Sequence, residues 1–331
     1  MDFLLEYGLF LAKAVTWVAA ILVVATALFG LLRQQREHQG NQLEVKNLNH
    51  GFRDHVDVLQ HQLLTDDEFK QAGKARKSED KSRAKARKAG ATRSRLFVLD
   101  FHGDLQASGV ASLREEITAV LQVVKPGDEV LLRLESEGGV VHGYGLAASQ
   151  LRRLRQHGVK LTAAVDKVAA SGGYLMACVA DRILAAPFAI VGSIGVVAQL
   201  PNFNRLLKEK NIDFELHTAG EFKRTLTLFG ENTDEGRAKF RESLEEAHQL
   251  FKSFIAENRP VVDLAQVATG EHWFGSRALE LKLVDELMTS DDYLLDSARA
   301  RDLFEVRYKR RHSLLERLGI GLAKLRATVP F

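Results

Sequence analysis

A serine followed by two glycines is the first feature of this chain that suggests chemistry. Ser171 lies in the stretch VAASGGYLMA at residues 168–177. Residues 159–165 are predicted to form a buried strand and residues 172–180 an apolar helix, which places Ser171 at a strand-to-helix turn. A serine there commonly caps the helix by accepting a backbone N–H. The free N–H groups and positive dipole end of a helix would equally stabilise an oxyanion beside a nucleophile.

A nucleophilic serine needs donors for the charge that develops on its substrate. A second pair of glycines, Gly138 and Gly139, follows the predicted strand 130–134 in the stretch SEGGVV at residues 136–141. Paired glycines at the carboxyl end of a parallel strand can leave a backbone N–H free to point into a crevice. We therefore expect this turn to supply half of an oxyanion hole, and the start of the helix after Ser171 to supply the other half.

The serine also needs a base, and the residues alone leave two arrangements open. His142 follows the glycine pair and Asp166 precedes the Ser171 turn, so a triad with histidine is one arrangement. A lysine is the other, because burial can lower the pKa of a lysine until it is neutral near the operating pH. Lys223 follows a predicted strand at residues 214–217 and the flexible Gly220, so a loop could carry it inward.

The order of the motifs resembles the signal peptide peptidase A (protease IV) family. Four motifs carry the resemblance and two later ones extend it: SEGG at 136–139, AASGGY at 169–174, VGSIGV at 191–196, GEFK at 220–223, ATGEHWF at 268–274 and LVDE at 283–286. Within that family the chain is most similar to the SohB-type probable serine proteases. The resemblance spans residues 96–287, and the ordered set is far more specific than any one motif.

The resemblance implies a role for each matching residue. Ser171 matches the nucleophile and Lys223 the general base, which together form a Ser-Lys dyad. Ser193 matches a serine that orients the lysine. The backbone N–H groups of Gly139 and Gly172 match the oxyanion donors.

One residue departs from the family pattern, because Glu137 stands where the family usually has proline. A proline would fix φ at this turn, whereas a carboxylate near the site favours the charged form of a lysine. Neither the residues nor the resemblance indicates a cofactor or metal, since the sequence has no HExxH motif and no cluster of cysteine and histidine residues.

The elements around these motifs predict an α/β fold. We expect strands at 96–101, 130–134, 159–165 and 182–186, helices at 111–124, 144–156 and 172–180, and later elements at 202–210, 214–217 and 234–257. Helices that alternate with strands in this way indicate a mostly parallel sheet with crossover helices. The resemblance implies a ClpP/crotonase-like β-spiral that forms a homo-oligomeric ring, in which neighbouring subunits complete each active site.

An uncharged apolar run at residues 14–32 is about long enough to cross a bilayer. We expect an N-terminal transmembrane anchor at residues 1–33, because the acidic tail with Asp2 and Glu6 does not fit the alternative of a cleaved signal peptide. Arg33 and Arg36 favour a cytoplasmic location for the large C-terminal part of the chain. The best-known anchored relatives place the catalytic domain outside. We therefore expect the inner membrane of a bacterium and leave the side open.

Three segments come after the predicted anchor. Residues 34–95 are predicted to form a charged linker, helical or disordered, residues 96–300 the Ser-Lys peptidase domain, and residues 301–331 a basic amphipathic segment. With 46 basic and 43 acidic residues among 331, the net charge is +3, which does not indicate a nucleic-acid partner. The expected partners are a peptide or protein substrate, membrane lipid and further copies of the chain. A single cysteine, Cys178, excludes an intramolecular disulfide.

The sequence thus predicts a membrane-anchored serine endopeptidase that acts on membrane-derived peptides or on membrane and secreted proteins. Two alternatives remain. A crotonase-type acyl-CoA enzyme would share the oxyanion donors but would use acidic residues in place of a serine. A non-catalytic membrane scaffold ring would be consistent with the departure at Glu137.

Overall fold

The structure of the protein is a computed structural model that describes residues 42–88 and 93–309, together with Lys13, residues 16–18, Leu22 and Val24. The chain divides into two units, Met1–Glu44 with Tyr308–Phe331, and Val45–Arg307. Every residue for which the sequence predicts chemistry lies in the second unit.

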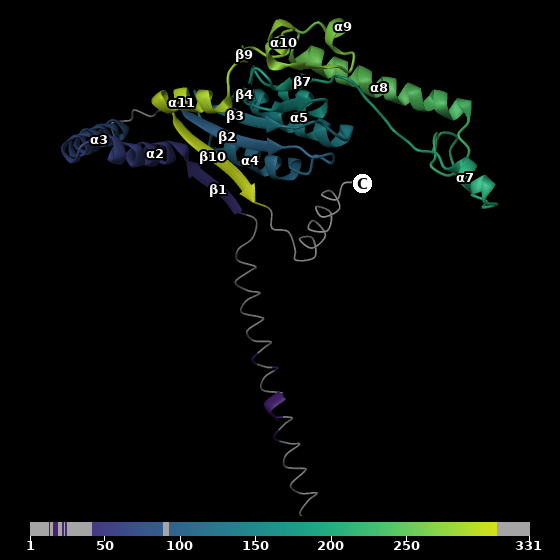
Figure 1. The fold of residues 1–331 in the computed structure, drawn as a ribbon, viewed down its shortest axis with the longest axis horizontal. Coiled ribbons are helices and arrows are strands. Elements are labelled where there is room, and N and C mark those ends of the chain that lie inside the picture. The colour runs from purple at the N-terminus through teal and green to yellow at the C-terminus, as the bar shows by residue number, and fades with distance from the viewer. Residues whose placement is uncertain are drawn as a thin grey trace, which may run out of the picture. The chain divides into compact units, whose positions relative to one another are not determined.

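The described elements are strands and helices, which alternate from β2 to β4 (residues 95–165), as Figure 1 shows. In chain order they are β1 (Gln42–Asn47), α2 (Leu48–Leu63), α3 (Asp66–Lys88), β2 (Arg95–His102), α4 (Val110–Val123), β3 (Glu129–Glu135), α5 (Val141–Gln156), β4 (Lys160–Val165), β5 (Val168–Ala170), α6 (Gly172–Ala177), β6 (Arg182–Ala185), β7 (Ile190–Gly192), α7 (Asn204–Glu209), α8 (Asp234–Asn258), α9 (Leu264–Val267), β8 (His272–Phe274), α10 (Gly275–Glu280), β9 (Glu286–Leu287), α11 (Ser290–Ala300) and β10 (Asp302–Lys309).

The strands form two sheets. The larger has seven strands in the order β1-β10-β2-β3-β4-β6-β9, and its pairs from β10 through β9 are parallel. The smaller has three strands in the order β5-β7-β8, with β5 and β7 parallel and β7 and β8 antiparallel. Crossover helices between parallel strands account for this alternation. The predicted α/β class is therefore confirmed.

The larger sheet is buried on both faces, because successive side chains of a strand point to opposite sides. Phe97, Leu99 and Phe101 of β2 face a core that includes side chains of α4, α5 and α6. Leu96 and Val98 face a second, smaller core that includes side chains of α11, with residues of α2 packed against it. The helices that follow β2 and β3, α4 and α5, therefore share a core with α6, which begins directly after Ser171.

The predicted elements from residue 96 to residue 186 all occur within a few residues of their expected bounds. The strand predicted at residues 214–217 is wrong, since those residues are exposed and belong to no strand. Phe214 and Leu216 alternate with polar residues as in a strand, but no neighbouring strand pairs with them. Phe214 instead contacts Phe229, with ring centroids 5.8 Å apart.

The structure describes parts of the three segments that the sequence predicts after the anchor. Residues 34–95 include β1, α2 and α3, and Asn49 Oδ1 accepts a hydrogen bond from Leu303 N at 2.7 Å, which ties α2 to β10. β10 extends the sheet beyond the domain boundary predicted at residue 300, because Leu303 and Val306 are buried in it. Residues 310–331 lie outside the described residues.

Most of the anchor predicted at residues 1–33, with most of its apolar run at 14–32, also lies outside the described residues. Among the residues that the structure does describe, no helix is both long and apolar enough to cross a bilayer.

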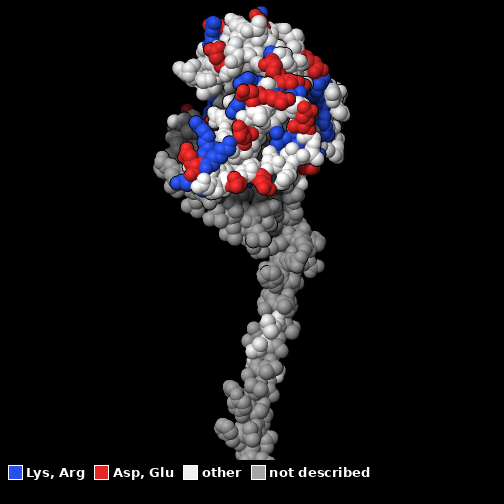
Figure 2. Space-filling view, turned by 90° about the vertical axis from the view of Figure 1, so that its right-hand side faces the viewer, with Lys and Arg blue, Asp and Glu red and all other residues white. Residues whose placement is uncertain are grey.

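Acidic and basic side chains are interleaved on the face drawn in Figure 2. The same mixing occurs along α8, where Arg237 pairs with Asp234 and Lys239 pairs with Glu242, each at 2.8 Å. Pairs of this spacing on a helix surface contribute little stability but keep the local charge balanced.

A network of charged side chains joins β2, β3 and β10. Asp100 lies opposite Arg133 in the β2–β3 register and pairs with it, and Arg307 Nη2 donates to Asp100 Oδ2 at 2.8 Å. Burial alone would raise the pKa of the Asp100 carboxyl, but the hydrogen bonds and charges of Arg133 and Arg307 outweigh burial and hold that pKa below its ordinary value.

We predict that this network makes the protein less stable in acid. A carboxyl whose pKa is lowered by folding stabilises the folded state above its unfolded pKa of about 3.9, and that contribution is lost as the pH falls through the lower folded pKa. In urea unfolding from about pH 6 to about pH 3, Asp100→Asn should lose less stability than the wild type. Asp213→Asn, at an exposed position, should follow the wild type. Equal slopes for wild type and Asp100→Asn would contradict this account.

Candidate active site

Ser171 lies between β5 and α6 in an unusual backbone conformation. Its φ is 50° and its ψ is −116°, and its side chain makes no capping hydrogen bond to the helix that follows. The capping role that the sequence left open therefore does not apply, and the hydroxyl has no hydrogen-bond partner among the residues that the structure describes. A non-glycine residue in this region carries roughly 1–3 kcal/mol of strain, which must be held by its surroundings. Ser171 N donates to Gly192 O at 2.8 Å, so the smaller sheet holds it.

Ser193 lies beside Ser171 in the register of the smaller sheet. Ala170 pairs with Gly192, so the residues that follow each of them leave the sheet together. Ser193 has a φ of 52°, and its N–H donates to Glu271 O at 2.7 Å. The structure thus brings the second predicted serine next to the first.

The glycine pair after β3 lies against the start of α6. A Cβ added to Gly138 would lie 2.8 Å from Gly172 N and 2.8 Å from Ser171 Cβ, closer than real Cβ atoms approach. Gly138 also has a φ of 94°, which favours glycine. Only glycine therefore allows these two turns to meet.

Two backbone donors remain free where the turns meet. Within the described residues, the N–H groups of Gly139 and Gly172 donate no hydrogen bond, whereas the N–H of Gly138 donates to Ser136 Oγ at 3.1 Å. Gly172 is the first residue of α6, where a helix leaves its N–H groups unsatisfied. The predicted oxyanion donors, Gly139 and Gly172, are therefore both available to a negatively charged oxygen.

Lys223 is not brought to these residues within the chain. It is exposed, its N–H donates to Gly220 O at 3.1 Å, and its ammonium group has no hydrogen bond or ion pair with any residue that the structure describes. The candidate site of one chain thus contains Ser171, Ser193, Gly139 and Gly172 but lacks the predicted base.

The structure does not bring His142 and Asp166 together as a triad with histidine would require. His142 is exposed on α5, while the Asp166 carboxylate accepts hydrogen bonds from Ser290 N at 2.8 Å and Ser290 Oγ at 2.6 Å. Asp166 is thus engaged at the start of α11 and makes no hydrogen bond to His142 among the described residues. Glu137 is exposed.

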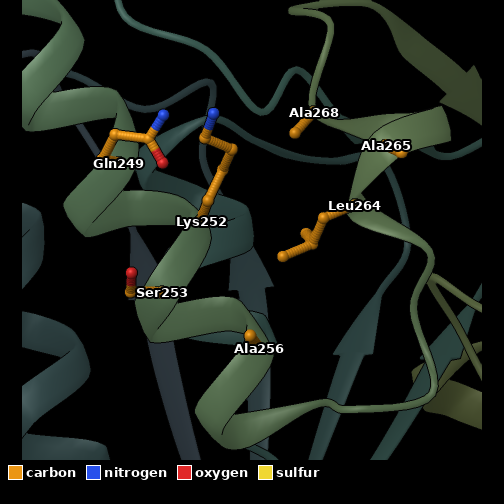
Figure 3. Close-up of a pocket in the computed structure, with 7 residues that line it drawn as sticks. All are labelled: Gln249, Lys252, Ser253, Ala256, Leu264, Ala265 and Ala268. Atoms are coloured by element: carbon orange, nitrogen blue, oxygen red, sulfur yellow. The ribbon is translucent and has the colours of Figure 1, made fainter.

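A hollow of about 470 Å³ lies away from these residues, between α8 and α9. In Figure 3 the side chain of Leu264 extends from α9 toward α8, which contributes Lys252 and Ala256. None of its lining residues carries predicted chemistry, so we place the candidate site at Ser171 and not at this hollow. In the part of the chain that the structure describes, no cluster of three His, Cys, Asp or Glu side chains is arranged to hold a metal ion.

Comparison with known proteins identifies the family. The chain matches the description "Peptidase family S49 N-terminal" over residues 2–151 and "Peptidase family S49" over residues 153–303. It is 51% identical over 330 residues to the "Probable protease SohB" of Haemophilus influenzae, covering 96% of this chain and 92% of the relative. It is 50% identical over 317 residues to the "Probable protease SohB" of Buchnera aphidicola subsp. Acyrthosiphon pisum, covering 96% and 93%. The chain belongs to peptidase family S49, and the resemblance to SohB-type proteases is confirmed.

Two solved structures show a distant resemblance to the chain. A ClpP1 mutant from Listeria monocytogenes has a TM-score of 0.38 at 14% identity and covers 63% of this chain and 98% of its own. A mutant of the 1510-N membrane-bound stomatin-specific protease in complex with a substrate peptide has a TM-score of 0.39 at 12% identity, covering 71% and 100%. Because both scores are low, the family assignment depends on the sequence matches, and the ClpP/crotonase-like β-spiral stays a prediction.

We predict that a methyl group on Gly138 disrupts the site. Gly138→Ala should slow the labelling of the protein by a serine-reactive fluorophosphonate about 100-fold, the approximate cost of losing one oxyanion donor. Gly127→Ala is the matched control, because Gly127 also has a positive φ, of 88°, but a Cβ there would meet nothing within 4 Å. Each variant should lose about 1 kcal/mol or more of stability from backbone strain. Equal labelling rates at equal stability would contradict the prediction.

Proposed function

We propose that this chain is a serine peptidase in which Ser171 is the nucleophile and Lys223 the base. The observation that carries the proposal is that Ser171, whose backbone is held at a φ of 50°, makes no capping hydrogen bond, while the N–H groups of Gly139 and Gly172 donate to no residue that the structure describes. Membership of peptidase family S49 supports peptide hydrolysis over acyl-CoA chemistry and over a scaffold without activity.

The proposed reaction proceeds through an acyl-enzyme. The lysine takes the Ser171 proton as Oγ bonds to the peptide carbonyl carbon, and the carbonyl oxygen becomes an anion that accepts hydrogen bonds from Gly139 N and Gly172 N. Collapse of this intermediate breaks the C–N bond, and the lysine returns the proton to the amine that leaves. Water then gives a proton to the lysine as it attacks the ester carbonyl carbon, the bond from that carbon to Ser171 Oγ breaks, and the lysine returns the proton to Ser171 Oγ.

We propose that Lys223 reaches Ser171 of a neighbouring copy of the chain. Lysine acts as a base where burial disfavours its charge, and Lys223 is exposed in the single chain. The segment that carries it, residues 197–229, also exposes many large apolar side chains for its length: Val197, Leu200, Phe203, Leu206, Ile212, Phe214, Leu216, Phe222, Leu228 and Phe229. Apolar surface of this kind favours association. A homo-oligomeric ring would cover the segment and supply the base together, and Ser193 would orient the lysine.

The membrane anchor is part of the proposal. Residues 14–32 would hold the protein in the inner membrane of a bacterium, and its substrates would be membrane-derived peptides or membrane and secreted proteins. The uncharged run in the sequence supports this location, and the side on which the catalytic part lies stays open.

The dyad predicts which single changes abolish activity. Ser171→Ala and Lys223→Ala should each abolish hydrolysis of fluorescein-labelled casein and labelling by a fluorophosphonate, while the wild-type labelling rate rises with pH as the base loses its proton. Lys210→Ala, at another exposed lysine of the same segment, should label at the wild-type rate. Undiminished labelling of Lys223→Ala would exclude the lysine as base.

A mixing experiment tests the shared site. If Ser171 and Lys223 come from different copies, combining the inactive Ser171→Ala and Lys223→Ala chains should restore activity, up to about one site in four for random assembly in a ring. The restored activity should be lost when Ser171→Ala is mixed instead with a chain that carries both substitutions. A dyad within one chain would give no activity in either mixture.

A further inference from the structure

Two buried hydroxyl groups lie behind the turn that presents Gly139. Ser136 is 1% exposed and Tyr144 is 0% exposed, and their oxygens are 2.6 Å apart. Gly138 N donates to Ser136 Oγ at 3.1 Å, and Tyr144 Oη donates to Asp104 O at 2.9 Å. Neither side chain stands out in the sequence, because Ser136 only begins the SEGG motif and Tyr144 belongs to no motif.

The four groups form a chain of hydrogen bonds with one direction. A backbone N–H can only donate and a carbonyl oxygen can only accept, so the two ends fix what lies between them. Ser136 Oγ accepts from Gly138 N and donates to Tyr144 Oη, which donates to Asp104 O. Burial also raises the pKa of the Tyr144 phenol above its ordinary value, which keeps this proton in place at alkaline pH. The hydroxyls of Ser136 and Tyr144 therefore each have one donor and one acceptor as partners.

The hydrogen-bond chain decides which glycine can bind the oxyanion. Ser136 Oγ occupies the N–H of Gly138, and the N–H of Gly139 is left free. Val140 N donates to Leu105 O at 2.9 Å, so the residue after the pair is held as well. The orientation of the Gly139 peptide is thus set from both sides.

The same two residues also contact the nucleophile's side of the site. The backbone of Ser136 pairs with β5, since Ser136 N donates to Val168 O and Ala170 N donates to Ser136 O, each at 2.9 Å. The Tyr144 ring lies against Gly172, where an added Cβ would be 2.4 Å from Tyr144 Cγ. Ser136 and Tyr144 therefore connect the turn of Gly139 with the turn of Ser171 and Gly172.

We propose that Ser136 and Tyr144 are positioning residues that set the spacing between the two oxyanion donors, Gly139 N and Gly172 N. This proposal rests on the proposed function of Ser171. It assigns to the hydroxyl pair an effect on the rate of reaction, because a donor that is misplaced by a fraction of an ångström loses its advantage mainly in the transition state.

The test measures how a fluorophosphonate labels single variants of the full chain. Tyr144→Phe keeps the ring against Gly172 and removes only the hydroxyl. Ser136→Ala removes the other hydroxyl of the same hydrogen-bond chain. Each should lower the labelling rate at saturating probe (kinact) about 10-fold or more, with the half-saturating probe concentration (KI) changed less than about two-fold. A loss of folded protein would instead lower the labelled fraction and leave kinact unchanged.

The two changes should also fail to add. Because both act through one hydrogen-bond chain, the double variant should be no slower than about the slower single variant. Tyr293→Phe is the matched control, since its buried hydroxyl donates to Glu129 Oε2 at 3.1 Å in the second core. It should lower the melting temperature as Tyr144→Phe does and leave kinact unchanged. Equal kinact values for these two variants, or additive losses in the double variant, would overturn the proposal.

Ser171→Ala, measured in the same series, separates this proposal from the one on which it rests. If Ser171→Ala is still labelled at the wild-type rate, the proposed function fails and the positioning role fails with it. If Ser171→Ala is unlabelled and Tyr144→Phe keeps the wild-type kinact, only the positioning role fails.

Discussion

The site depends on a strand of three residues that is held from both sides. β5 exchanges two hydrogen bonds with Ser136 on one side, accepting one at Val168 O and donating one from Ala170 N, and it pairs with β7 on the other side. Its last bond, from Ser171 N to Gly192 O, holds the backbone at a φ of 50°. This conformation costs roughly 1–3 kcal/mol, and a strand of three residues is too short to maintain it alone. The neighbouring strands must therefore stabilise it. In this conformation the Ser171 hydroxyl makes no capping hydrogen bond to α6.

Close packing around the turns is the second requirement, and glycine meets it at two contacts. Gly138 lies against Ser171 and Gly172, and Gly192 lies against the Trp273 ring, where an added Cβ would be 2.8 Å from the nearest ring carbon. Both glycines have a positive φ. In the proposed site the N–H groups of Gly139 and Gly172 would share one oxygen, and this requires the two turns to meet. The glycines of the sequence motifs are therefore structural conditions for the chemistry.

The sequence predicted the local structure around the candidate site residues that lie in contiguous motifs. Ser171, Gly139 and Gly172 stand at the ends of a strand or the start of a helix whose apolar patterns are clear, so their positions followed from local structure. The strands β5 and β7 were missed because three residues are too few to show a period. The link from Ser136 to Tyr144 was missed because it forms only when the start of α5 folds back behind the turn.

The surroundings of Lys223, the proposed base, could not be derived from the sequence, for a different physical reason. Lys223 lies in a segment whose apolar side chains are exposed, so its surroundings are not determined by this chain alone. The strand predicted at residues 214–217 failed in the same segment, since alternation of apolar and polar residues forms a strand only beside a pairing partner. Local pattern therefore succeeded where the chain provides its own neighbours.

The most direct test of the account is a crystal structure of the protein after reaction with a fluorophosphonate. The account predicts a phosphonyl group bonded to Ser171 Oγ, with its oxygen about 2.7–3.1 Å from both Gly139 N and Gly172 N. An adduct on another side chain, or a phosphonyl oxygen that points to solvent and contacts neither N–H, would contradict it.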